Sequence, residues 1–404
     1  MLKSLVRLGV FAVLCLGLGV AQKSWIAVAE PKIEGALAAL PSGDYIPLRW
    51  DTLAKLERLE LLAVQTQMFN PCRTARALAF LSVAMNDTLN VVKGRPGADA
   101  NVAVAYAAQE VMLYLHPTFP NLKDGVREAV QTVYDAAAKA GGDKAGLEAS
   151  REIGRRIGLQ IAAFGRKDRA NHQTIPQYPK VVPGVWALTF GYTAVEPGWG
   201  EVVPIGIPKD QLAQATPPPA WDSPQYEQER TRFWAEQAKL DDHRKAIADK
   251  WAGDPGTVSP PGLWQETALT LLKDRGKTAE EAVAILAPLN VAMHDAFIAC
   301  WKAKFTYYTA RPNQWVATFD KKWKPYLRTP KFPAYPSGHS TISGAAATVL
   351  AALLPEDKQA FTAMAQEASD SRIIAGIHWF VDADGGLDLG QRVGEQVLAM
   401  SSEQ

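Results

Sequence analysis

The chain contains 404 residues, of which 48% are hydrophobic and 21% are charged. This composition is typical of a globular protein rather than a disordered one, and the length is sufficient for one large domain or two packed halves. Because 43 basic and 42 acidic side chains give a formal net charge of only +1, the chain lacks the basic surplus of a nucleic-acid-binding protein.

The N-terminal residues have the pattern of a secretory signal peptide. The basic segment MLKSLVR precedes the apolar segment LGVFAVLCLGLGVA, and Ala27-Val28-Ala29 matches a small-residue cleavage site. Cleavage after Ala29 would make residues 1–29 a signal peptide and send the mature protein to the periplasm or the exterior. An uncleaved anchor is the alternative. Past this segment no apolar run approaches the 18 residues of a membrane-spanning helix, so we expect no span in the mature protein.

Helical periodicity begins near residue 50. Leucines recur at helical spacing in 50–68, the segment 71–92 starts with a proline at its first helical position, and alanine-rich helices are predicted over 101–116 and 122–165. These helices predict an N-terminal bundle over residues 30–171.

Residues 172–222 differ from what precedes them because they are dense in proline, glycine and tryptophan. Such a composition predicts a long irregular connection over the surface. Helical periodicity resumes at about residue 224 and continues to the end, which predicts a C-terminal bundle over 223–404. We find no sustained period-2 alternation, so the predicted fold class is all-α, with two packed helical bundles.

An internal echo links the two halves. LSVAMNDTL at 81–89 resembles LNVAMHDAF at 289–297, which lies 208 positions further along. Repetition at about half the chain length suggests an internal duplication, although nine residues give it little support. The second copy contains Asp295, which we expect to pair with Arg372 or Lys304, whereas its counterpart Asp87 would be structural.

The cysteines and most histidines carry no recognisable pattern. After removal of the signal peptide only Cys72 and Cys300 remain. Export would permit a disulfide between them, but two isolated cysteines form neither a disulfide framework nor a zinc site. We interpret four histidines without ligand-like spacing as non-functional: His116, His172, His243 and His294.

Three short motifs follow one another in the C-terminal half. They are Lys304-x6-Arg311-Pro312, Pro336-Ser337-Gly338-His339 and Ser371-Arg372-x5-His378-x3-Asp382. Each motif alone is a weak signal, because short patterns occur often by chance. A lysine or arginine is usually a solvated surface charge, and a lone histidine is usually a hydrogen-bonded core residue. All three motifs in this order make those readings improbable.

The residue types suit a tetrahedral oxyanion. Lys304, Arg311 and Arg372 would supply three cations, two of them planar forks that match oxyanion geometry. Ser337 and the amide of Gly338 would add neutral donors at a helix start, where unpaired N–H groups and the macrodipole favour anions. Three buried cations without a counter-charge are costly, so we expect an anion among them.

The two motif histidines supply the proton chemistry. His339 can exchange a proton near neutral pH. His378 and Asp382 are four positions apart, so they would share one helix face, and the carboxylate would orient the imidazole and raise its basicity.

These motifs resemble the signature of the superfamily that joins type 2 phosphatidic acid phosphatases to vanadium haloperoxidases. In the phosphatases, the residue that matches His378 attacks phosphorus and becomes a phosphohistidine, and the residue that matches His339 protonates the leaving group. In the haloperoxidases, the residue that matches His378 is the one protein ligand of vanadate, and the one that matches His339 handles peroxide protons. The resemblance further implies that Lys304 polarises bound peroxide.

Residues that flank the motifs favour the haloperoxidase branch. Trp301 and Phe332 stand where chloroperoxidase-type enzymes carry the aromatic walls of the halide region, although both could equally be core aromatics. Phe380 departs from that pattern, in which a basic residue follows the tryptophan, and this puts the halide preference in doubt. The membrane lipid phosphatases of the superfamily carry their motifs on spanning helices, which this sequence lacks.

The sequence therefore predicts an exported vanadium-dependent haloperoxidase, with vanadate as cofactor and with hydrogen peroxide and halide as substrates. The alternative is a soluble acid phosphatase that acts on a small phosphoester through a phosphohistidine and needs no vanadate. A non-catalytic oxyanion-binding protein is a third alternative, which the two histidines disfavour. Nothing in the sequence determines the oligomeric state.

Overall fold

The computed structural model describes residues 24–26, 33–188 and 192–402. Among these residues it contains helices and no β-sheet, which confirms the predicted all-α class. The N-terminal half has α1 Glu34–Ala38, α2 Trp50–Thr66, α3 Pro71–Val92, α4 Ala100–Leu115, α5 Pro120–Lys139 and α6 Lys144–Gly165. The C-terminal half has α7 Pro224–Gln237, α8 Asp242–Lys250, α9 Ser259–Asp274, α10 Ala279–Tyr307, α11 Pro312–Val316, α12 Gly338–Leu353, α13 Lys358–Ile374 and α14 Phe380–Ser402.

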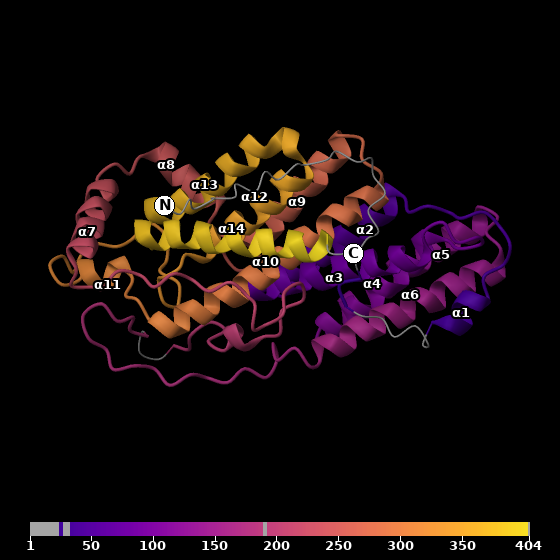
Figure 1. Cartoon of the computed structure of the whole chain (residues 1–404), viewed down its shortest axis with the longest axis horizontal. Coiled ribbons are helices and arrows are strands. Elements are labelled where there is room, and N and C mark those ends of the chain that lie inside the picture. Colours follow the sequence, from indigo (N-terminus) through magenta and orange to yellow (C-terminus); the bar gives the residue numbers. More distant parts are fainter. Residues whose placement is uncertain (1–23, 27–32, 189–191, 403–404) are drawn as a thin grey trace, which may run out of the picture.

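The helix starts follow from local sequence. Asn70 accepts a hydrogen bond from the Arg73 N–H ahead of α3, which has proline at its first position, as predicted. Thr278 and Glu281 form a reciprocal capping box at the start of α10. Between α6 and α7 the described residues form only the 3-10 helix η2, Trp199–Glu201, and this connecting segment runs along the outer edge of the C-terminal half (Figure 1).

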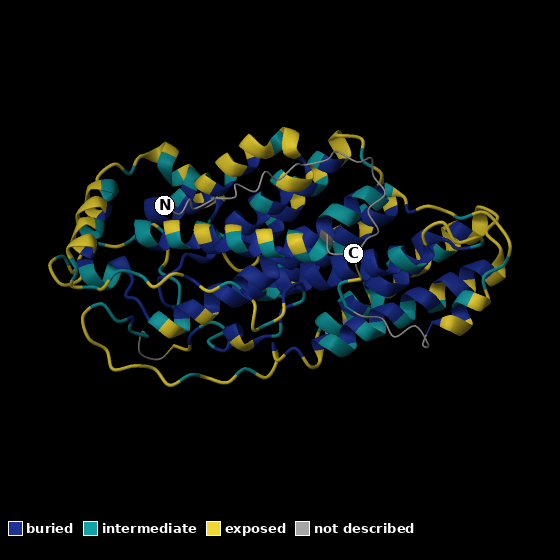
Figure 2. Ribbon diagram, in the orientation of Figure 1, coloured by how far each residue is buried: buried dark blue, intermediate teal, exposed yellow. Residues whose placement is uncertain are grey.

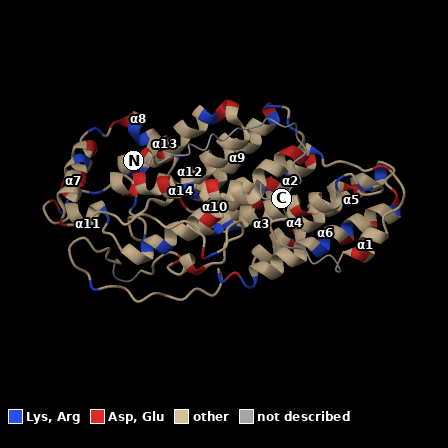
Figure 3. Ribbon diagram, viewed as in Figure 1, with Lys and Arg blue, Asp and Glu red and all other residues tan. Residues whose placement is uncertain are grey.

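Two long helices form the centre of the molecule. α3 and α10 pack against each other and are buried along most of their length (Figure 2). Of the described helices, α10 has the length and apolar composition to cross a membrane, but 89% of that apolar window is buried in the fold, as in the core helix of a globular protein. Acidic and basic side chains are spread over both halves of the molecule (Figure 3).

The packing of α14 on α12 depends on close backbone approach. A Cβ on Gly390 would lie 2.0 Å from the carbonyl oxygen of Thr341, so only glycine fits there. This contact brings the start of α14 beside the start of α12, which are the two helix ends that carry the second and third motifs. The glycine therefore positions the site indirectly.

The echoed segments occupy equivalent places on α3 and α10. Asp87 accepts hydrogen bonds from the N–H groups of Trp25 and Ile26 and from the Ser24 hydroxyl. Asp295 accepts from the N–H groups of Ile205–Ile207 at 2.8–3.1 Å. A buried carboxylate thus binds the backbone of a short bend in each half, which supports the suggested duplication.

The predicted pairing of Asp295 with Arg372 or Lys304 is wrong. Its two oxygens accept three backbone N–H groups of the connecting segment, and among the described residues no ion pair joins it to either cation. Asp87 has the structural role that we expected for it.

The contacts of Asp87 allow a stability test. A chain that starts at Ser24 is expected to be about 1–3 kcal/mol more stable than one that starts at Glu30, because the shorter chain leaves a buried carboxylate without its donors. Urea unfolding of both chains measures the difference. Asp87→Ala should reduce it to the part that comes from Trp25 and Ile26, which pack on the core. Equal stability of the two parent chains would contradict the assigned role. The predicted cleavage site after Ala29 itself lies outside the described residues, and cleavage there would remove Ser24–Ile26.

Candidate active site

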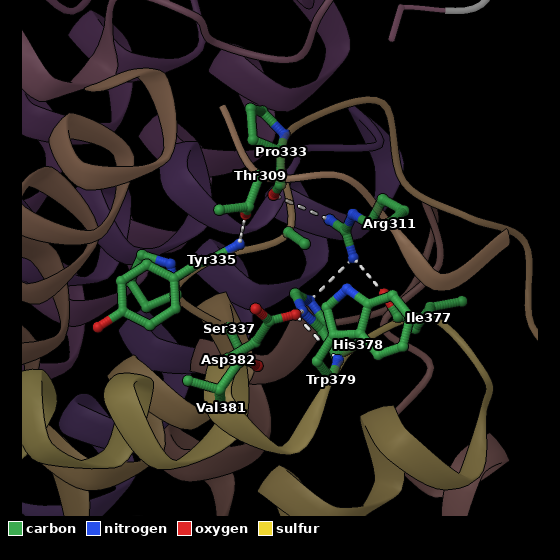
Figure 4. Close-up of polar contacts among 12 residues, drawn as sticks. Thr309, Arg311, Pro333, Tyr335, Ser337, Ile377, His378, Trp379, Val381 and Asp382 are labelled. Carbon is green, nitrogen blue, oxygen red and sulfur yellow. Dashed lines mark hydrogen bonds and ion pairs between the residues drawn. The ribbon is translucent and has the colours of Figure 1, made fainter. Parts of the chain in front are cut away.

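The three motifs meet at one buried place between helix ends (Figure 4). Lys304 comes from the last turn of α10, Arg311 caps α11, and Arg372 comes from the last turn of α13. Ser337 caps α12, while His378 and Asp382 flank the start of α14. All of these side chains are buried.

His378 and Asp382 form the centre of the site. The Nδ1 atom of His378 lies 2.9 Å from Oδ2 of Asp382, which also accepts the N–H of Trp379 at 2.9 Å. Because the carboxylate accepts, the ring proton sits on Nδ1 and Nε2 keeps its electron pair. His378 precedes the first residue of α14, so the pair is joined as a helix cap and does not share a helix face as we predicted.

The second ring nitrogen of His378, Nε2, faces Arg311. The Nη1 atom of Arg311 donates to Nε2 at 2.9 Å and to the carbonyl oxygen of Ile377 at 2.7 Å. Burial and the neighbouring charges of Arg311, Lys304 and Arg372 hold the pKa of His378 well below its usual range. The imidazole is therefore neutral at physiological pH, as a nucleophile or ligand must be.

Lys304 is held by backbone carbonyl groups. Its ammonium group donates to the oxygens of Pro333 at 3.0 Å, Ala334 at 2.8 Å and Pro336. Burial lowers the pKa of Lys304. Sequence reasoning missed these three carbonyls, because backbone groups of an irregular loop leave no signature in residue types.

The cations outnumber the carboxylates that could neutralise them. Burial lowers the pKa of Arg311 and of Arg372 to about 9 each. Among the described motif residues, Asp382 is the buried acid. The Ser337 hydroxyl accepts the N–H of Ser340 at 3.3 Å and keeps its own proton for a ligand, and the Gly338 N–H belongs to the unpaired first turn of α12. This donor set fits a tetrahedral oxyanion such as vanadate or phosphate.

Trp301 and Phe332 lie beside the cations. Their ring centroids are 4.9 Å apart, and the ammonium of Lys304 lies 5.0 Å from the Phe332 ring and 5.7 Å from the Trp301 ring. The indole N–H of Trp301 donates to Val195 of the connecting segment at 3.1 Å. The two rings thus form one apolar wall against the positive charges.

The second-motif histidine has a backbone partner. Nε2 of His339 lies 2.7 Å from the carbonyl oxygen of Trp251, at the end of α8. Burial, followed by the charge of Arg372, holds the pKa of His339 well below its usual range. Sequence reasoning gave no role to α8.

The residues that we interpreted as non-functional lie away from this centre. His116 pairs with Glu60 at 2.9 Å, and His294 is enclosed by Phe80 and Trp199. Cys72 and Cys300 are both buried and both free thiols.

Comparison with solved structures identifies the fold. A bacterial vanadium-dependent iodoperoxidase is similar over 89% of this chain and 99% of its own, with a TM-score of 0.77 and 23% identity. A bacterial vanadium-dependent chloroperoxidase in its holo form is similar over 83% of this chain and 93% of its own, with a TM-score of 0.61 and 13% identity. At these identities the likeness establishes the fold.

Sequence comparison finds similarity both to a helical-bundle domain family and to acid phosphatases. Residues 284–361 match the family described as the VCPO second helical-bundle domain. A non-specific acid phosphatase of Providencia stuartii is 32% identical over 108 residues, which are 26% of this chain and 44% of the relative. An acid phosphatase of Zymomonas mobilis is 42% identical over 53 residues, 13% of this chain and 20% of the relative. The chain thus covers less than half the length of these curated relatives.

The fold, the matched helical-bundle domain and the converging motifs agree with one another. The chain has the all-α fold of the vanadium haloperoxidases, and parts of its sequence are similar to a helical-bundle domain family and to acid phosphatases.

Proposed function

We propose that the protein is an exported vanadium-dependent haloperoxidase, which oxidises halide with hydrogen peroxide to hypohalous acid and water. The observation that carries this choice is the wall of Trp301 and Phe332 packed against Lys304. An apolar, polarisable surface beside a buried cation excludes water and suits a weakly hydrated anion, whereas phosphoester hydrolysis has no need of such a surface.

The residues would hold vanadate as follows. Nε2 of His378, which accepts from Arg311 in this structure, would be the single protein ligand, and Asp382 keeps the proton on Nδ1 so that the Nε2 electron pair could turn to the group. The oxygens would be bound by the cations Lys304, Arg311 and Arg372 and by the Ser337 and Gly338 donors. When bound, the group supplies Lewis-acid activation of peroxide.

The remaining work is done by the chain itself. His339 accepts a proton from incoming peroxide, and the positive charge of Lys304, whose N–H groups are bound by backbone carbonyls, polarises the peroxide oxygen that halide attacks. Halide transfers an electron pair to that oxygen as the O–O bond breaks, and with one proton taken up the products are hypohalous acid and water. Trp301 and Phe332 keep water from the halide.

An acid phosphatase is the second candidate, because the curated relatives are acid phosphatases and the same donors fit phosphate. There His378 would attack phosphorus and form a phosphohistidine, while His339 would protonate the leaving alcohol. A non-catalytic oxyanion-binding protein ranks last, since it needs neither histidine.

One experiment separates the three candidates. Purified mature protein is given orthovanadate, peroxide and iodide, bromide or chloride, and halogenation of a β-diketone is followed; in parallel, phosphate release from p-nitrophenyl phosphate is measured without vanadate. Vanadate-dependent halogenation supports the proposal. Phosphatase turnover that vanadate only inhibits, without halogenation, overturns it. Vanadate binding with neither activity indicates the binding protein.

Phe332→Ala tests the aromatic wall. We expect halide oxidation to fall about tenfold or more, since two cation–π contacts of about 1 kcal/mol each are lost and water enters. Phosphoester hydrolysis and vanadate affinity should change less than about threefold. Phe305→Ala is the matched control, because Phe305 packs on Trp186 and Tyr308 instead. Equal losses in both reactions would remove the halide role of Phe332.

A further inference from the structure

At the C-terminal end of α8, two backbone carbonyl groups face the site. The final carbonyls of any helix lack partners within the helix. Here the oxygen of Ala248 accepts from Nη2 of Arg372 at 3.0 Å, and the oxygen of Trp251 lies 2.7 Å from Nε2 of His339. One short helix end thus contacts a residue of the second motif and a residue of the third.

The contact to His339 selects one form of its ring. A carbonyl oxygen can only accept, so Nε2 of His339 must carry the proton. In the neutral ring Nδ1 then has a free electron pair and is the nitrogen that can take up a proton. Once it does, the Nε2–H bond to Trp251 is kept, so the clamp accommodates both charge states without rearrangement.

The charged groups around His339 are mainly cations, so a protonated His339 ring benefits from a carbonyl partner. The charged or titratable groups that act on His339 are Arg372 from α13, Lys304 from α10, Arg311 before α11 and His378 before α14. The cations oppose a positive charge on the ring. The negative end of the α8 dipole and the Trp251 carbonyl favour it, because cations are stabilised at helix C-termini. The end of α8 therefore offsets part of the repulsion when His339 gains a proton.

The position of Trp251 is fixed by a carboxylate on α13. Oε1 of Glu367 accepts the indole N–H of Trp251 at 2.9 Å and the ammonium of Lys250 at 2.6 Å. The buried Trp251 ring also packs at 6.3 Å from Trp264, whose indole N–H donates to Ser343 of α12 at 3.0 Å. Glu367 lies five residues before Arg372 on the same helix, so one element holds both ends of the clamp.

We propose that residues 248–251 form a clamp whose backbone carbonyls fix the His339 ring and the Arg372 guanidinium, and that Glu367 is the positioning residue that holds this clamp in place. Because the clamp keeps a proton on Nε2, Nδ1 of His339 is the nitrogen that accepts a proton from the ligand. The identity of the proton donor, peroxide, rests on the proposed function; the clamp and the ring form do not.

Three variants test the proposal. Glu367→Ala removes the acceptor for Trp251 and should lower kcat for halide oxidation about 10- to 100-fold, as the loss of outer-shell partners does at other sites, with little change in the KM for halide. Glu367→Gln keeps an oxygen acceptor for the indole and should restore most of the activity. Lys245→Met, on the same helix but outside the clamp, removes only an exposed ion pair with Asp242 and should leave kcat unchanged.

A spectroscopic readout makes the test independent of the reaction. In protein labelled with ¹⁵N-histidine, without vanadate, peroxide or halide, the resonances absent from His339→Gln belong to His339. They should show protonated Nε2 and unprotonated Nδ1, unchanged in Glu367→Gln and shifted toward a mixture of both forms in Glu367→Ala. Protonated Nδ1 in the parent protein, or the same spectrum in Glu367→Ala, overturns the proposal. Absent halogenation together with the expected spectra would refute the haloperoxidase function and leave the clamp standing.

Discussion

His378→Ala is expected to abolish activity, by at least roughly 10³-fold, whichever reaction of the superfamily the protein catalyses. Nε2 of His378 is an unprotonated imidazole nitrogen that faces the cations and accepts from Arg311. Residues that act as a unit with their partners lose nearly all function when the central member is removed. The assay is vanadate-dependent halogenation with phosphoester hydrolysis measured alongside it.

The variant must be shown to fold, because the change removes one hydrogen-bond partner each from Arg311 and Asp382 and costs about 1–3 kcal/mol. Circular dichroism and thermal unfolding provide that check. His294→Leu is the matched control: His294 is equally buried, neither ring nitrogen has a protein hydrogen-bond partner, and full activity is expected. Activity retained in folded His378→Ala would refute the assigned site.

The motif residues could be located from the sequence because the three short patterns, in their order, resemble a known signature. Lys304, Arg311 and His378 are distant in the chain, and their residue types suit one shared anion. The helices were equally predictable, since leucine periodicity and Pro71 placed α2 and α3 within two residues of their observed ends.

Features that depend on the backbone could not be predicted. The sequence shows that Asp295 is a carboxylate in an echoed segment, but not that Ile205–Ile207 present three N–H groups to it. The contacts of the Ala248 and Trp251 carbonyls could not be predicted either, because every residue has a carbonyl group and only the fold determines where it points. A retrospective signal exists for Asp295: a polar residue on an otherwise apolar core helix must find donors, and its copy Asp87 does the same.

The geometry also explains how one site can serve two chemistries. Lys304 and Arg311 are held by carbonyl oxygens and the Asp382 carboxyl is fixed by Trp379, so the donors are positioned before any ligand arrives. Such prearranged donors stabilise charge without reorganisation, on vanadate and on a phosphoryl group alike. The two reactions would then diverge at the aromatic wall rather than among the cations.

Asp382→Asn is expected to lower activity by about 10- to 100-fold while preserving the shape of the site, as the loss of a carboxylate partner does for ligand histidines. Oδ2 of Asp382 accepts both the Nδ1 proton of His378 and the N–H of Trp379, so the amide oxygen can keep both contacts, whereas the negative charge that makes Nε2 basic is lost. Nε2 then binds vanadate, or attacks phosphorus, less well.

The spectrum of ¹⁵N-labelled His378 should keep the proton on Nδ1, and vanadate affinity should fall in parallel with activity. Asp384→Asn, at an exposed position on the same helix turn, is the matched control and should retain activity. If Asp382→Asn kept the parent rate and the parent vanadate affinity, the charge of Asp382 would not activate His378. Because the prediction concerns the basicity of Nε2, it holds for a haloperoxidase and a phosphatase alike, and it tests the feature on which both depend.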